Sequence, residues 1–364
     1  MRIIPSHLRW PLALLAVLLT SLALGGCSSS GRIGASSWPG LTVDEDTAYV
    51  AFTSAVFAVD IQSGQEIWRF PAESDQSKLF YAPPAITAEG QLVVGSYDGM
   101  VYILDASDGR LVWSFDEAQG RIMGGPVVDG DHAYVPSADG SIYALDLTSR
   151  DLAWSYATER ALWAAPLVSG GIVYVASLDH SIYALDQESG ALLWSEELSA
   201  AMGEAPALGD NYLVVGTFGN GLHALDSSRG TVLWPFETEG WVWTQPAIKD
   251  GIVYFADTEG VVYAVDLESG DELWHMATGE LIAAKPVIGD GGVYFVSESG
   301  TVFAFEFDSP RSLWPSNPSL TAKLLSDPAI YQDSLLIPAL ESDCLIHDVA
   351  LESGASICLF QPQN

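Results

Sequence analysis

Large aromatic side chains stand at a regular offset from the prolines of this chain, and their ring faces could hold a ligand. The position three residues before a proline, or before Leu41 in its place, holds an aromatic residue in four repeats, Trp38, Tyr81, Trp163 and Trp243. In the others it holds Met123, Gly203, Ala283 or Leu325, and Trp241 lies two residues before Trp243. Aromatic rings that converge at a surface cavity anchor a peptide strand or a flat ligand. We therefore predict a candidate binding face formed by the five aromatic residues and Met123, with Arg121 and Arg160 at its rim. The alternative is that the rings plug the cavity as packing.

Acidic side chains beside turns could instead bind a metal ion. The motifs are Ser96-Tyr97-Asp98, Ser137-Ala138-Asp139 and Ser177-Leu178-Asp179, and we expect the same face of the fold to hold Lys78, Glu204, Lys285 and Asp327. A hard cation such as Ca²⁺ needs several converging oxygen ligands, and the sequence has no compact Asp/Asn loop with that spacing. An Asp next to a Gly is more typical of a turn. We therefore predict no metal site and no catalytic residues.

The first of the three cysteines indicates a lipid anchor. Arg2 and Arg9 precede an apolar run over residues 11–24, and Leu24-Gly25-Gly26-Cys27 then resembles a bacterial lipobox. The run is too short for a comfortable membrane span and suits the apolar region of a signal peptide. We predict a signal peptide over 1–26, a lipidated Cys27 and a tether over 27–40. The alternative is an ordinary cleaved signal with a chance cysteine.

The other two cysteines, Cys344 and Cys358, lie close together near the C-terminus. One even pair in an exported chain favours a disulfide bond. The register of the surrounding repeat places the two residues offset rather than directly opposite each other. The sequence therefore leaves both the bonded and the free state of these cysteines as alternatives.

The elements that must position all these residues are eight copies of one unit of about 40 residues. Each copy has a strand ending in Asp, a turn and then a Trp, and the tryptophans are Trp68, Trp113, Trp154, Trp194, Trp234, Trp274 and Trp314. Four short strands can be read in one unit, rich in β-branched and aromatic residues. We predict an all-β, eight-bladed β-propeller of four-stranded antiparallel blades over residues 41–364. A linear β-solenoid is the alternative.

The regular Asp and Trp residues are expected to be structural. Each Asp can bond to backbone N–H groups in its turn, and each Trp can fill the gap between adjacent blades. An active site needs one of each group, so sevenfold repetition argues against catalysis.

The pattern Tyr-Ala-Leu-Asp-x-x-x-Gly-x-x-x-Trp, as in residues 183–194, resembles the pyrroloquinoline quinone (PQQ)-like propeller repeat over about residues 41–360. Two branches share this repeat: the PQQ-dependent alcohol and glucose dehydrogenases, and the non-catalytic outer-membrane assembly factor BamB with its relatives. The dehydrogenases usually add long insertions around the cofactor, and many place adjacent cysteines over it. This chain has minimal blades and no adjacent Cys pair.

The resemblance therefore implies a non-catalytic, membrane-anchored scaffold without a cofactor. Its partners would be envelope proteins, either the β-barrel assembly machinery or unfolded strands. The alternatives are a ligand-sensing cell-surface propeller or a PQQ-dependent dehydrogenase. The dehydrogenase would need Ca²⁺, Trp163 or Trp243 stacked on PQQ, and Asp327 or Glu204 as base.

The acidic composition of the chain is consistent with export. The chain has 47 acidic and 14 basic residues, a formal charge of −33, and residues 1–26 contain two Arg and no acid. So acidic a body is a poor partner for nucleic acid or an anionic lipid surface. We expect a monomer held to the cell envelope through its lipid anchor alone, on the outer face of the cytoplasmic membrane or on the outer membrane.

Overall fold

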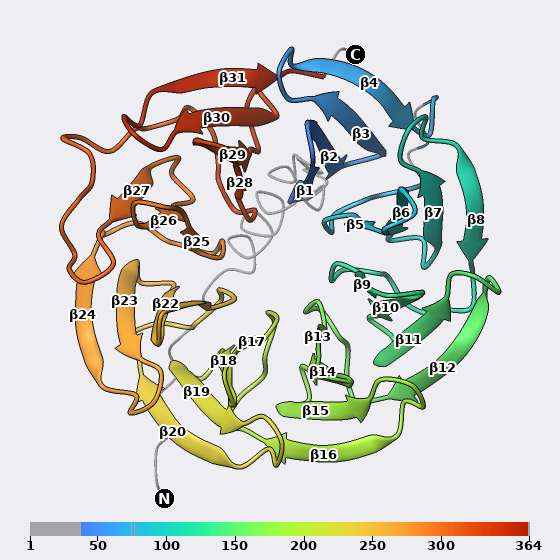
Figure 1. The fold of residues 1–364 in the computed structure, drawn as a ribbon, viewed down its shortest axis with the longest axis horizontal. Coiled ribbons are helices and arrows are strands. Elements are labelled where there is room, and N and C mark those ends of the chain that lie inside the picture. The colour runs from blue at the N-terminus through green and yellow to red at the C-terminus, as the bar shows by residue number, and fades with distance from the viewer. Residues whose placement is uncertain (1–37, 74, 76, 363–364) are drawn as a thin grey trace, which may run out of the picture. The chain divides into compact units, whose positions relative to one another are not determined.

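The computed structural model describes residues 38–73, 75 and 77–362, which form thirty-one β-strands and no helix. The strands make eight antiparallel sheets arranged as blades around a centre (Figure 1). The predicted all-β, eight-bladed propeller is therefore confirmed. The predicted signal peptide, Cys27 and most of the tether lie outside the described residues. Within the described part, no helix has the length and apolar character needed to cross a membrane.

The blades follow one another in chain order, and within each the strands run from the centre outward. Blades 1 and 2 contain β1 (Gly40–Asp44), β2 (Thr47–Phe52), β3 (Ala55–Asp60), β4 (Gln65–Phe70), β5 (Ala85–Ile86), β6 (Gln91–Gly95), β7 (Val101–Asp105) and β8 (Leu111–Phe115). Blades 3 and 4 contain β9 (Val127–Asp129), β10 (His132–Pro136), β11 (Ser141–Asp146), β12 (Asp151–Ala157), β13 (Leu167–Ser169), β14 (Ile172–Ala176), β15 (Ser181–Asp186) and β16 (Leu192–Glu197). Blades 5 and 6 contain β17 (Ala207–Gly209), β18 (Tyr212–Thr217), β19 (Gly221–Asp226), β20 (Val232–Glu237), β21 (Ala247–Lys249), β22 (Ile252–Ala256), β23 (Val261–Asp266) and β24 (Glu272–Ala277). Blades 7 and 8 contain β25 (Val287–Ile288), β26 (Val293–Val296), β27 (Val302–Phe305), β28 (Ala329–Tyr331), β29 (Ser334–Pro338), β30 (Ile346–Ala350) and β31 (Ser356–Phe360).

The two middle strands of a blade are buried on both faces because a neighbouring blade covers each side. In blade 6, β22 and β23 are continuous apolar runs, and their residues are almost all buried. The outermost strand β24 is mostly exposed, with Trp274 as its buried residue. This pattern explains why the middle strands read as unbroken hydrophobic runs rather than alternating ones.

The repeated Trp of each blade contacts the turn of the next blade. Trp234 is buried, and its indole N–H donates to the carbonyl oxygen of Leu267 at 3.0 Å. Its ring lies on Gly270, where an added Cβ would come within 2.7 Å of the ring and where φ is +75°. A residue with a side chain could therefore not take that place without moving the ring. Equivalent N–H bonds of 2.9–3.1 Å are made by Trp68, Trp154, Trp194, Trp274 and Trp314.

The repeated Asp has the turn-forming role that its position predicts. The Asp266 carboxylate accepts hydrogen bonds from the backbone N–H groups of Glu268 and Ser269. Two turns depart from the pattern. Blade 3 has Arg150, at φ 60°, and blade 7 has Pro310 where the other turns have Gly. Trp113, which precedes blade 3, is only half-buried.

Blade 7 differs from the predicted four strands, because only three form a regular sheet. Its outer segment keeps isolated bridges, Phe305 to Ser312 and Thr301 to Ser319. The segment contains Pro310, Pro315 and Pro318, and proline has no N–H to give to a strand ladder.

The ring closes between blades 1 and 8, each of which is one contiguous stretch of chain. The Phe57 and Phe360 rings lie 5.7 Å apart within an apolar cluster shared by the two blades. Blade 8 has no repeated Trp, but a disulfide bond joins Cys344 and Cys358 there, with their Cα atoms 5.7 Å apart. Cys358 is opposite His347 in the ladder, so Cys344, which precedes β30, is indeed offset from it.

Candidate binding face of the propeller

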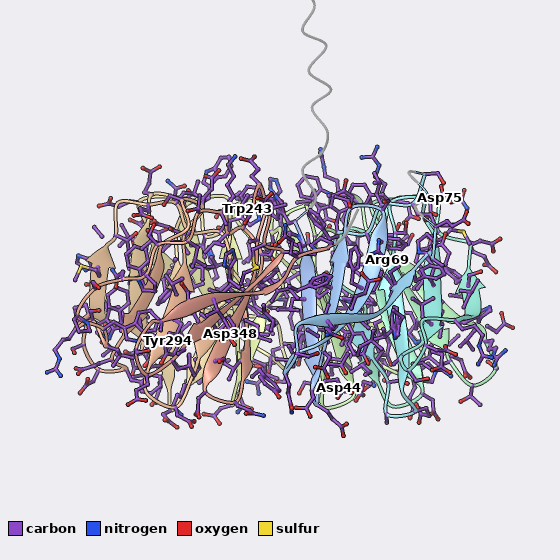
Figure 2. The ribbon with its side chains drawn as sticks, turned by 90° about the horizontal axis from the view of Figure 1, so that it is seen from above. Asp44, Arg69, Asp75, Trp243, Tyr294 and Asp348 are labelled. Atoms are coloured by element: carbon purple, nitrogen blue, oxygen red, sulfur yellow. A yellow bond between two sulfur atoms is a disulfide. The ribbon has the colours of Figure 1, made fainter. Side chains whose placement is uncertain are left out.

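The residues of the predicted face come from two sets of connections at the same edge of the ring. The connections from the fourth strand of one blade to the first of the next hold Asp75 and Trp243, which lie at one edge, while Asp44 lies at the opposite edge (Figure 2). The connections between second and third strands share the edge with Trp243. Backbone bonds join the two sets: Thr258 N–H donates to the Trp241 carbonyl and Phe218 N–H to that of Ala201. These bonds hold the loops of the face in place.

The Ser-x-Asp motifs on this face are part of the framework. Asp139 accepts hydrogen bonds from the Tyr143 hydroxyl at 2.8 Å and from the Gln119 N–H at 2.8 Å. Asp179 accepts equivalent bonds from Tyr183 and Glu159. Each carboxylate therefore connects the third strand of its blade to the loop that leads into the same blade from the preceding one. In blade 5 both partners of the pair are replaced together, by Gly219 and His223.

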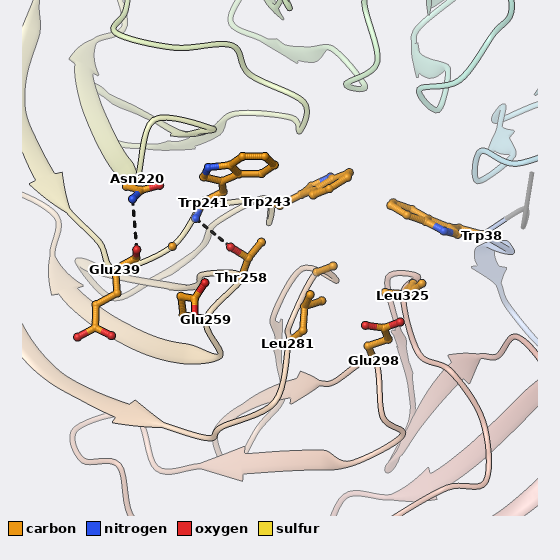
Figure 3. A pocket seen from close by; sticks show the side chains of 12 residues that line it. Trp38, Asn220, Glu239, Trp241, Trp243, Thr258, Glu259, Leu281, Glu298 and Leu325 are labelled. Carbon is orange, nitrogen blue, oxygen red and sulfur yellow. Dashed lines mark hydrogen bonds between the residues drawn. The ribbon is translucent and has the colours of Figure 1, made fainter. Parts of the chain in front are cut away.

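A cleft of about 660 Å³ lies on this face over blades 5 to 8 (Figure 3). Trp38, Trp241 and Trp243 line it together with Leu281 and Leu325, and the charged residues that line it are Glu239, Glu259 and Glu298. Trp241 is 49% exposed and Leu281 is 37% exposed. The cleft therefore combines an apolar floor with acidic walls.

The rings of the cleft form a continuous row. The Trp38 and Trp243 centroids are 5.6 Å apart, those of Trp243 and Phe218 are 5.4 Å apart, and those of Phe218 and Trp241 are 5.6 Å apart. Phe218 occupies the space above Gly203, where an added Cβ would lie 2.4 Å from the Phe218 ring. A side chain at residue 203 would displace Phe218 and with it the support of both tryptophans.

Three of the remaining predicted residues lie around the central channel, which holds a separate cavity of about 480 Å³. Tyr81, Met123 and Trp163 line it, and Trp38 lines both cavities. Arg121 lies over the Tyr97 ring at 5.3 Å, and Tyr97 packs on Tyr81 with a centroid distance of 3.9 Å. Arg160 is exposed and lines neither cavity. The structure thus divides the predicted face into a cleft and a channel mouth.

One side of the channel is polar. Glu204, Gln245, Lys285 and Asp327 come from the loops before the first strands of blades 5 to 8, and all four line the cavity. The Lys285 ammonium is 3.6 Å from the Asp327 carboxylate, and the backbone N–H of Lys285 donates a hydrogen bond to the same carboxylate at 2.8 Å. Burial, and then repulsion from Asp327, raise the pKa of Glu204, while Lys285 and a hydrogen bond from the Trp243 side chain oppose the rise.

We expect Glu204→Gln to remove part of the pH dependence of stability. Because the pKa of Glu204 is raised on folding, the native state keeps a proton that the unfolded chain loses above its ordinary pKa of about 4.3. Wild-type stability should therefore fall as pH rises from there toward the raised pKa. The glutamine variant should gain on wild type over that range in urea unfolding. Glu188→Gln, at an exposed turn of the opposite face, is the control, and equal pH slopes in all three proteins would contradict the expectation.

Two aromatic residues of the face were not singled out from the sequence, Tyr97 and Phe218. Both lie just after a second strand, Tyr97 two residues after β6 and Phe218 one residue after β18, at the place that Ala138, Leu178, Thr258 and Glu298 take in other blades. Alignment on that turn would have shown a second ring of variable residues beside the first.

The matching family profile is that of PQQ-like β-propellers, in agreement with the fold and the repeat. The profile described as "Outer membrane protein assembly factor BamB" matches residues 53–177, 98–204 and 159–339. These overlapping matches cover most of the chain, so the chain belongs to this family.

Two curated relatives match over short stretches. One is a polyvinylalcohol dehydrogenase of Pseudomonas sp, 28% identical over 128 residues, in a match that covers 27% of this chain and 20% of that enzyme. The other is the outer membrane protein assembly factor BamB of Marinobacter adhaerens, 32% identical over 95 residues, which are 26% of this chain and 23% of that protein. The chain thus spans less than a quarter of the length of either relative in these matches.

Solved structures share the fold over most of the chain. BamB from Moraxella catarrhalis has a TM-score of 0.70 at 21% identity and covers 82% of this chain and 90% of its own. A europium-containing methanol dehydrogenase has a TM-score of 0.70 at 14% identity, with 82% and 81% covered. Ika8, a computationally designed protein, has a TM-score of 0.73 at 17% identity, with 84% and 94% covered. Identities this low carry the fold and not the activity.

Proposed function

We propose that this chain is a non-catalytic scaffold of the cell envelope that binds other envelope proteins during outer-membrane protein assembly. The observation that carries the proposal is the family match to an outer membrane protein assembly factor across residues 53–339. The face described above supplies a surface for such binding, because its loops differ from blade to blade, and connecting loops are where binding residues concentrate. The turns of the opposite face repeat and carry little partner-specific information.

The proposal includes a lipid anchor on Cys27, which lies outside the described residues. An apolar run followed at once by Leu24-Gly25-Gly26-Cys27 supports it. Acyl chains on Cys27 would hold the propeller at a membrane surface, since each buried CH₂ contributes about 0.8 kcal/mol. Mass spectrometry of the mature N-terminal peptide tests this part, and a mature chain that begins elsewhere than Cys27 would refute it.

Trp243→Ala should weaken capture of the natural envelope partner by tens-fold, because an aromatic anchor at a cavity can contribute more than about 2 kcal/mol. The measurement is affinity capture from solubilised native membranes with each variant as bait, followed by titration of the captured partner. Leu193→Ala is the matched control, since Leu193 is 51% exposed on the outer strand β16. If folded Trp243→Ala binds its partner normally, Trp243 is packing and the binding surface lies elsewhere.

A second candidate, a PQQ-dependent dehydrogenase, is favoured by the partial match to polyvinylalcohol dehydrogenase. The channel fits this cofactor poorly. PQQ is a tricarboxylate, and Lys285, already paired with Asp327, is the sole Lys or Arg among the described residues that line the channel, where Glu204 adds a further acid. Incubation with PQQ and Ca²⁺, followed by absorbance of the bound cofactor and dye reduction with alcohols, tests this candidate.

A further inference from the structure

The floor of the cleft is an exposed aromatic surface held in a rigid frame. The row of rings from Trp38 to Trp241 leaves Trp241 half exposed. The backbone N–H of Trp241 donates a hydrogen bond to the Thr258 hydroxyl at 3.0 Å, and this bond fixes the loop that holds Trp241 (Figure 3). Exposed apolar surface that is grouped around a cavity marks an interaction site more often than scattered exposed residues do.

The walls of the cleft carry one sign of charge. Its described lining residues include three glutamates and no lysine or arginine. Glu298 lies 4.0 Å from the Lys323 ammonium. Glu239 and Glu259 are exposed and form no ion pair within the described part of the chain. Their negative charge is therefore available to a partner.

Together these features select a cation that also has apolar surface. An ammonium or guanidinium group is attracted to indole faces, with tryptophan the strongest of the aromatic rings. It also forms charge-assisted hydrogen bonds with carboxylates. A carboxylate-bearing ligand or an anionic lipid headgroup would instead be repelled by the walls of the cleft and by the net charge of −33. The volume of about 660 Å³ is within the range of about 300–1,000 Å³ in which sites enclose small groups.

We propose that this cleft receives a lysine or arginine side chain from an extended, basic and apolar segment of the partner protein. The proposal rests on the proposed scaffold function and narrows it to a class of partner sequence. The cation lies on the indole of Trp241 and is attracted by the carboxylates of Glu239 and Glu259, which line the same cleft. Neighbouring apolar side chains of the segment pack on Trp243, Leu281 and Leu325.

Two short fluorescein-labelled peptides test the proposal, one of alternating Arg and Leu and one in which neutral citrulline replaces every Arg. Fluorescence anisotropy should show the Arg peptide binding wild type at least about tenfold more tightly than the citrulline peptide. In the Glu239→Gln/Glu259→Gln variant the preference should fall below about threefold. Trp241→Ala should weaken binding of the Arg peptide by about tenfold.

Two controls separate the cleft from general acidity and general stickiness. Glu188→Gln/Glu268→Gln removes two exposed acids from turns of the opposite face and should leave the preference for Arg unchanged. Leu273→Ala removes an apolar side chain that is 50% exposed on the outer strand β24, outside the cleft, and should leave peptide affinity unchanged. Equal affinity of wild type for the two peptides, or equal losses in the control and cleft variants, would overturn the proposal.

The outcome also distinguishes this proposal from the function on which it rests. If the Glu239→Gln/Glu259→Gln variant still captures the natural envelope partner with wild-type affinity, the scaffold function stands and the cleft proposal fails. If no variant or wild type captures an envelope protein, the scaffold function fails even where the Arg peptide binds. Binding of wild type to anionic vesicles with no preference between the peptides would overturn the cleft proposal in favour of a membrane surface.

Discussion

Trp234→Ala should lower the free energy of unfolding by about 3–5 kcal/mol, the range for truncation of a buried Trp. The indole is 7% exposed, packs on Gly270 of the next blade and donates to the Leu267 carbonyl. Removal would leave a cavity between two blades and a carbonyl without that donor, and each has a cost of its own. Urea unfolding followed by tryptophan fluorescence and circular dichroism measures the loss, and coincident curves would justify a two-state treatment.

Two other tryptophans provide matched controls for this loss. Trp241→Ala removes a half-exposed indole of the candidate binding face and should cost well below about 1.5 kcal/mol, since truncation of an exposed side chain leaves no buried cavity. Trp113→Ala should lie between the two, because Trp113 is half-buried and faces a blade that has Arg150 in place of the usual glycine. Equal losses of unfolding free energy in all three variants would contradict the expectation that the buried indole between blades contributes most.

Replacing Cys344 and Cys358 together by serine should cost about 3 kcal/mol, the chain-entropy value for a loop of this length. The cysteines are 14 residues apart in sequence, and blade 8 has no repeated Trp of its own. Reduction of wild type should cause the same loss, and the double variant should not respond to a reductant. Hydrogen exchange should place the loss in β30 and β31 and in the seam with blade 1, where Phe57 packs on Phe360.

The loss of the Cys344–Cys358 disulfide bond should also weaken the contact between blades 1 and 8. Blades 1 and 8 are joined by side-chain packing, without a strand exchanged between them. Opening of β31 would therefore expose the cluster that closes the ring. A reductant effect confined to residues 344–358, with the seam as protected as before, would contradict this coupling.

The period of about 40 residues and the recurring Asp, Gly and Trp were sufficient to predict blades, their number and the structural role of those residues. The reason is that these features are local: each turn and strand depends on residues within one repeat or the next one. The three prolines of residues 310–318 set the seventh repeat apart from the other repeats in sequence. In the structure its fourth strand is reduced to isolated bridges.

The arrangement of the candidate binding face followed only from the closed ring. Trp38 precedes blade 1 and Trp243 precedes blade 6, yet their rings meet across the channel mouth. The same closure brings Glu204 within electrostatic reach of Asp327 and Lys285, and it places Trp241 in a cleft apart from Tyr81 and Trp163. Such contacts depend on the angle between successive blades and on the radius of the channel. These quantities arise from the summed packing of all eight blades, and no single repeat encodes them.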